Sequence, residues 1–123
     1  MTQKRALQIA VAIAGLVPVT AGSIGISRPD LLELAATPAA STHAAYLSGL
    51  LLGIGLAFWS TVPAIEIKGV RFTLLTALVV LGGLGRLTLA IRLGVWSPSV
   101  TLPLAMELAV TPALWAWQQR LVA

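Results

Sequence analysis

Four long apolar segments separated by short polar ones organise the sequence. They cover residues 6–26, 42–61, 70–93 and 100–117. A helix needs about 20 apolar residues to cross the hydrocarbon core of a bilayer, so each segment is long enough to span a membrane. The pattern predicts an all-α fold over residues 1–123. We expect a single four-helix transmembrane bundle with up-down-up-down topology.

The first apolar segment also resembles a secretory signal peptide. A basic start at Lys4 and Arg5 precedes it, and small residues near Val19 and Ala21 imitate a cleavage site. Its length favours a membrane span instead.

The connection between the first two spans is the longest in the chain. Ser27, Pro29 and Asp30 are typical of a helix start, and the amphipathic run from Leu31 to Ala36 follows them. The Thr37-Pro38 pair should end this run. The pattern therefore predicts a short interfacial helix between spans 1 and 2.

Glycines recur at helical spacing in three of the spans. In lipid, glycine allows a neighbouring backbone to approach closely. We therefore predict helix packing at Gly15, Gly22, Gly49, Gly53, Gly82 and Gly83.

An arginine and a glutamate interrupt the third and fourth spans. By helical rise, Arg86 lies about 9 Å deeper than Arg92, and Glu107 lies about 10 Å from the same surface. Consecutive spans joined by a short turn are antiparallel neighbours, so the two charges should meet. An ion pair of Arg86 with Glu107 would neutralise two costly intramembrane charges.

The second span begins with two further polar side chains. His43 and Tyr46 are three residues apart and share one side of a helix. They are interpreted as interfacial polar residues, as a proton carrier at His43, or as part of an outward-facing pocket for an apolar ligand. In the last case His43, Tyr46, Arg86 and Glu107 would line the pocket together.

Composition narrows the class of protein. The chain is 58% hydrophobic and 10% charged, against about 25% charged in a soluble domain. It has no cysteine and one histidine, so we expect no cofactor, no metal site and no paired haem ligands. The net charge of +4 comes from basic residues scattered beside the apolar segments, which favours topology signals over nucleic-acid binding.

The basic residues also predict orientation. Five of them fall on one side of the predicted spans, so both termini should be cytoplasmic. They are Lys4, Arg5, Lys68, Arg71 and Arg120.

The segments AAYLSGLLLGIGL, VVLGGLGRL and AMELAVTPAL, together with the glycine-rich first span, resemble a bacterial four-span membrane family known as domain of unknown function 4345. The resemblance covers nearly the whole chain, and GGLGRL is its most specific element. It implies four helices in a bacterial cytoplasmic (inner) membrane and no established reaction. That family often has a basic residue just before the aromatic one of span 2, where this chain has Ala44 and Ala45 before Tyr46.

Several functions fit these patterns. A non-enzymatic accessory or oligomeric membrane subunit, held by the Arg86–Glu107 pair, is the main hypothesis. Its partners would be membrane lipids and either a homo-oligomer or a larger membrane complex. A proton-coupled small carrier and a binder of a lipid, quinone or other apolar ligand are the alternatives. An enzyme is not expected, because the sequence shows no nucleophile-base constellation and no paired carboxylates.

Overall fold

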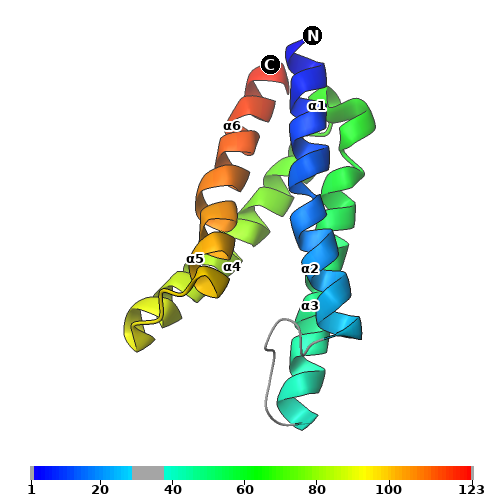
Figure 1. Cartoon of the computed structure of the whole chain (residues 1–123). Helices are drawn as coiled ribbons and strands as arrows, with labels where there is room; N and C mark the ends of the chain where they lie inside the picture. Colours follow the sequence, from blue (N-terminus) through cyan, green and yellow to red (C-terminus); the bar gives the residue numbers. More distant parts are fainter. Residues whose placement is uncertain (1, 29–37, 123) are drawn as a thin grey trace. The chain divides into compact units, whose positions relative to one another are not determined.

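All regular structure in the described part of the chain is helical (Figure 1). The computed structural model describes residues 2–28 and 38–122. The elements in chain order are α1 (Gln3–Ala14), α2 (Leu16–Ser27), α3 (Pro38–Trp59), η2 (Val62–Ile67), α4 (Gly69–Leu93), α5 (Pro98–Ala105), η3 (Met106–Val110) and α6 (Thr111–Val122). The all-α prediction is confirmed. The predicted interfacial helix from Leu31 to Ala36 lies outside the described residues.

Four helical stretches are long and apolar enough to cross a membrane. They are Gln3–Ser27, Thr42–Trp59, Gly69–Leu93 and Pro98–Leu121. Each overlaps one predicted span, so the prediction of four helices long and apolar enough to cross a membrane is confirmed. Large apolar side chains such as Val70, Leu81 and Leu102 are about two-thirds exposed or more, which suits contact with lipid.

The residues cluster into two compact units. The first unit comprises residues 8–63, and the second unit comprises residues 1–7 together with 64–123. We describe each unit separately.

The first unit is an antiparallel pairing of α2 with α3. A Cβ added at Gly22 would lie 2.6 Å from the backbone of both Ser48 and Leu52. Nearer the other end of the pair, a Cβ added at Gly55 would lie 2.7 Å from the Val19 side chain. The two helices therefore approach each other closely at Gly22 and Gly55, because glycine has no side chain to hold them apart.

The first span is broken into two helices at Gly15. The last hydrogen bond of α1 runs from the Gly15 N–H to the Val11 carbonyl at 2.9 Å, and the Val19 N–H donates to the Gly15 carbonyl at 3.2 Å. Pro18 explains the break, because it has no N–H to donate to the Ala14 carbonyl and its ring crowds that carbonyl.

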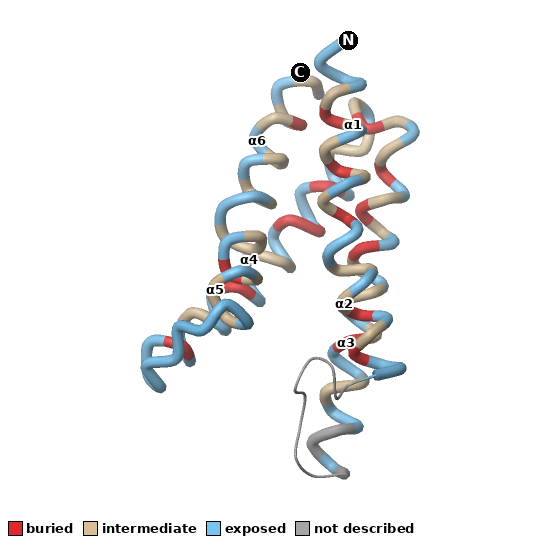
Figure 2. The backbone as a smooth tube through the Cα atoms, in the orientation of Figure 1, coloured by how far each residue is buried: buried red, intermediate tan, exposed pale blue. Residues whose placement is uncertain are grey.

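The second unit pairs α4 with the fourth span in antiparallel fashion. Trp115 Nε1 donates to Thr73 Oγ1 at 2.9 Å near one end, and Gly83 faces Glu107 further along. The buried positions of α4, red in Figure 2, are Phe72, Leu75, Thr76, Gly83 and Ala90. Gly94 ends α4 in the left-handed conformation with a φ of 66°, which glycine adopts without strain.

Candidate functional site

Arg86 of α4 and Glu107 of η3 form a two-point ion pair. Arg86 Nε donates to Glu107 Oε1 at 2.9 Å, and Arg86 Nη2 donates to Glu107 Oε2 at 3.2 Å. The arginine side chain is 41% exposed and the glutamate side chain 18% exposed. Two parallel N–H···O bonds fix both the distance and the orientation of a guanidinium and a carboxylate.

Gly83 brings the two elements close enough for this contact. It lies three residues before Arg86 on α4 and is buried. A Cβ at this position would come within 2.8 Å of Glu107 Cβ and 2.9 Å of Leu108 Cδ2. The missing side chain of Gly83 therefore sets the separation of α4 and η3.

Glu107 lies in a π-helical turn and not in a regular α-helix. The turn covers Met106–Val110, and both the N–H and the Oγ1 of Thr111 donate to the Met106 carbonyl, the latter at 2.7 Å. Pro112 follows the turn and offers no N–H to the Leu108 carbonyl, which accounts for the widened helix before it. Because a π turn holds more residues than an α turn, the direction of the Glu107 side chain differs from the one that regular helical spacing gives.

His43 and Tyr46 belong to a different compact unit from this pair. Both belong to α3 in the first unit, whereas Arg86 and Glu107 belong to the second. His43 and Tyr46 are exposed, Tyr46 to 65%. The structure thus brings Arg86 and Glu107 together, and the proposed four-residue pocket stays a prediction.

The six glycines predicted to pack differ in their surroundings. Gly15, Gly22 and Gly83 are buried, and an added Cβ would come within 3 Å of a neighbouring helix or side chain at each. Gly49 would make only ordinary contact, 3.9 Å from Ile26 Cδ1. At Gly53 and Gly82 no described atom lies within 4 Å of the added Cβ, so packing there has no support within one chain.

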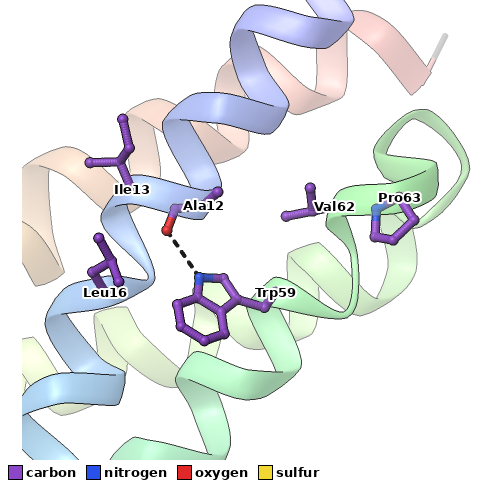
Figure 3. A pocket seen from close by; sticks show the side chains of 6 residues that line it. All are labelled: Ala12, Ile13, Leu16, Trp59, Val62 and Pro63. Carbon is purple, nitrogen blue, oxygen red and sulfur yellow. Dashed lines mark hydrogen bonds between the residues drawn. The ribbon is translucent and has the colours of Figure 1, made fainter.

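Trp59 packs against the first span where its helix is interrupted at Gly15. Its indole Nε1 donates to the Ala12 carbonyl at 3.0 Å, and its ring occupies the space that a side chain at residue 15 would need (Figure 3). An open apolar hollow of about 400 Å³ lies beside the ring. It is lined by Ala12, Ile13, Leu16, Trp59, Val62 and Pro63.

One end of the second unit carries a polar network. Gln118 is fully buried and its Nε2 donates to the Ile65 carbonyl at 2.9 Å. Trp117 Nε1 donates to Gln3 Oε1 at 2.9 Å. These two contacts tie the start of α1 and the end of η2 to α6.

An ion pair joins the same parts of the chain. Lys4 Nζ lies 3.1 Å from Glu66 Oε2. A backbone hydrogen bond at Glu66, followed by the hydrogen bond and charge of Lys4, lowers the pKa of the Glu66 carboxyl below its usual 4.5.

Nothing in the described residues forms a metal centre. No group of three or more His, Asp or Glu side chains lies close enough together there to hold a metal ion. The charged groups of the Arg86–Glu107 pair can neutralise each other, bind an anion through the arginine, or take up a proton on the glutamate.

Sequence reasoning missed several of these features. It named Gly15 as a packing position without finding Trp59 as the residue packed against it, and it did not find the π turn. Two prolines, Pro103 and Pro112, flank Glu107 in the fourth span, and that spacing is the one signal that could have indicated an irregular helix there.

The fold and the ion pair define an all-helical membrane protein with four candidate spans and a charged contact between the third and fourth. The chain belongs to the family described as Domain of unknown function (DUF4345), whose model matches residues 6–118. No curated protein and no solved structure matched the chain.

Proposed function

We propose that this protein is a non-enzymatic subunit of the bacterial cytoplasmic (inner) membrane that assembles with a second copy of itself. The four apolar helices support a multi-pass membrane protein. The family resemblance favours a bacterial source, and the basic residues beside the spans favour cytoplasmic termini.

One face of α4 carries this proposal. Leu78, Gly82, Gly85 and Leu89 follow one another at helical spacing and form what we call the α4 stripe. All four are exposed, and no described atom lies within 4 Å of a Cβ added at Gly82 or Gly85. The chain uses Gly83 for its own packing, so the glycines of the stripe remain available to another helix.

The Arg86–Glu107 pair supports the stripe from within the same unit. Arg86 lies seven residues before the end of α4, which is about 10 Å from that end along the axis. At such a depth an unpaired charge is costly in lipid, and the two-point contact with Glu107 offsets much of that cost. We infer that the pair fixes α4 against η3 inside the membrane while the stripe faces the second copy.

Disulfide cross-linking tests the assembly directly, because the natural chain has no cysteine. Leu78→Cys and Leu89→Cys should each give a cross-linked dimer on mild oxidation of native membranes. Leu84→Cys is the matched control, since Leu84 lies between them along α4 but on another face. Adding Gly85→Leu to the Leu78→Cys chain should abolish the dimer, because the larger side chain holds the helices apart.

Equal cross-linking through Leu84→Cys would show random collision in the membrane and would refute the proposal. So would a Leu78→Cys dimer that persists when Gly85 is replaced by leucine.

The π turn at Glu107 favours a second function, a proton-coupled carrier. Single π turns inside α-helices are frequent at functional sites, and a shift of the turn to regular α geometry would move Glu107 relative to Arg86. In that mechanism Glu107 accepts a proton when Arg86 releases it. Proteoliposomes of the wild type should then show pH-gradient-driven flux that Glu107→Gln abolishes, and unchanged flux in this variant would exclude the carrier.

A further inference from the structure

The second unit concentrates positive charge at one end. The contacts of Gln3 with Trp117 and of Gln118 with Ile65 hold the start of α1, the end of η2 and the end of α6 together, and α4 begins two residues after η2. Within or beside these segments the only acidic side chain is Glu66. The basic ones are Lys4, Arg5, Lys68, Arg71 and Arg120.

An open hollow of about 450 Å³ lies at this end, entirely within the second unit. Gln3, Trp117, Arg120 and Leu121 line it. Its walls combine a guanidinium, a carboxamide, an indole ring and one apolar side chain. Pockets of 300–1,000 Å³ with mainly apolar walls and a few polar groups are typical of small-ligand sites.

Arg120 is the charge that distinguishes this hollow from its surroundings. Lys4 is already engaged by Glu66 at 3.1 Å. Arg120 is exposed and has no hydrogen-bond or ion-pair partner among the described residues. Its five N–H donors are therefore available to a ligand, and a planar guanidinium matches the oxygens of a phosphate group.

Gln3 and Trp117 supply the remaining contacts. The Gln3 side-chain oxygen accepts the Trp117 N–H at 2.9 Å, which leaves the two N–H donors of the same carboxamide free. Trp117 and Leu121 add apolar surface to the same hollow. Tryptophan in the last turns of a membrane span is typical of the headgroup level, where a lipid presents both a phosphate and an apolar stem.

We propose that this hollow binds the phosphodiester headgroup of an anionic phospholipid. Arg120 pairs with the phosphate, Gln3 donates to a phosphate or glycerol oxygen, and Trp117 with Leu121 contacts the start of the acyl chains. The surrounding basic residues attract anionic lipid over neutral lipid, as clusters of basic residues beside membrane spans do. The site is independent of the α4 stripe and of any assembly through it.

Lipid titration of the purified protein tests the site. Phosphatidylglycerol added to the detergent-solubilised chain should raise its unfolding midpoint, and phosphatidylcholine should have a much smaller effect. Arg120→Gln should raise the half-saturating concentration of phosphatidylglycerol by about fivefold. This is the factor in affinity that one basic residue typically contributes to the binding of anionic lipid. Arg120→Lys should restore most of the affinity, because it keeps the charge.

Arg92→Gln is the matched control, since Arg92 is an exposed arginine in the last turn of α4 in the same unit. It should leave the titration unchanged. An equal loss of phosphatidylglycerol affinity in Arg92→Gln would show that only the net charge of the protein matters, and would overturn the site. If inorganic phosphate gave the same stabilisation, the ligand would be a phosphate ion and not a lipid. Equal stabilisation by phosphatidylcholine would show no preference for anionic lipid, and either result would overturn the proposal.

Discussion

In the membrane placement proposed above, the Arg86–Glu107 contact balances two charges that would each be costly alone in lipid. A lone arginine or carboxylate at the centre of a membrane helix costs about 3 kcal/mol on insertion scales. The two-point geometry, with distances of 2.9 and 3.2 Å, satisfies both groups at once. Removing one partner therefore leaves the other uncompensated, and removing both leaves no charge to compensate.

Replacing the partners singly and together tests this balance. Arg86→Leu and Glu107→Gln should each destabilise the detergent-solubilised protein by about 1–3 kcal/mol. The double replacement should recover much of the loss, with a coupling energy of about 1 kcal/mol or more between the two sites. Circular dichroism follows the unfolding of the wild type, the two single variants and the double variant, which together form a double-mutant cycle. Strictly additive losses of stability would contradict a structural pair.

Glu66 makes one part of stability depend on pH. Its pKa is lowered in the folded protein, first by a backbone hydrogen bond and then by Lys4. A carboxyl with a lowered pKa stabilises the fold above its unfolded pKa of about 4.5, and that contribution disappears as the pH falls through the lower folded value. The midpoint temperature of thermal unfolding should therefore fall as the pH is lowered below about 4.5.

Lys4→Met should make that drop smaller, because the unfolded and folded pKa values of Glu66 then lie closer together. Lys68→Met serves as the control for the loss of one positive charge near the same end of the second unit. Thermal unfolding from pH 3 to 6 measures both, and identical pH profiles for the wild type and Lys4→Met would contradict a role for Lys4.

The elements show which features follow from the sequence and which do not. Span number and approximate ends could be predicted because a bilayer imposes length and apolarity on each helix. The meeting of Arg86 and Glu107 at one depth could be anticipated because both lie at calculable distances along antiparallel helices. The π turn could not, because its position depends on how the helix relaxes before Pro112.

The glycine cluster of α4 illustrates the same limit. Gly82, Gly83 and Gly85 look equivalent in the sequence, yet only Gly83 faces η3. Which glycine faces inward depends on the rotation of α4 about its own axis. Packing against the fourth span sets that rotation, and apolar composition on every face gives no sequence signal for it.

Two alanine substitutions separate these roles. Gly83→Ala should destabilise the protein by about 1–3 kcal/mol, because the new Cβ would lie 2.8 Å from Glu107 Cβ and force α4 and η3 apart. Gly85→Ala is the matched control and should change stability by about 0.5 kcal/mol or less, since its Cβ meets no described atom within 4 Å. Denaturant titration in the same detergent compares them, and equal effects would refute the inward assignment of Gly83.

For the whole molecule, four helices are candidates to cross a membrane, and the basic residues beside them predict the direction. Lys68 and Arg71 lie in or beside the first turn of α4, and Arg120 lies in the last turn of α6. Positive charge in short loops holds them on the cytoplasmic side. With four spans, the proposed orientation puts the two termini on the same, cytoplasmic, side as η2 and the turn after Gly94 on the other.

Labelling of single cysteines checks this orientation, since the chain has none of its own. Ser97→Cys should react with a membrane-impermeant maleimide in spheroplasts, because it lies in the turn between α4 and α5. Thr2→Cys and Ile67→Cys should react only after the membrane is opened, and Ile67 is a suitable reporter because its side chain is 73% exposed. Labelling of Thr2→Cys in sealed spheroplasts would show that the orientation is opposite to the one proposed. It would also place the Arg120 hollow against the outer leaflet, so the same three variants decide which leaflet must supply its lipid.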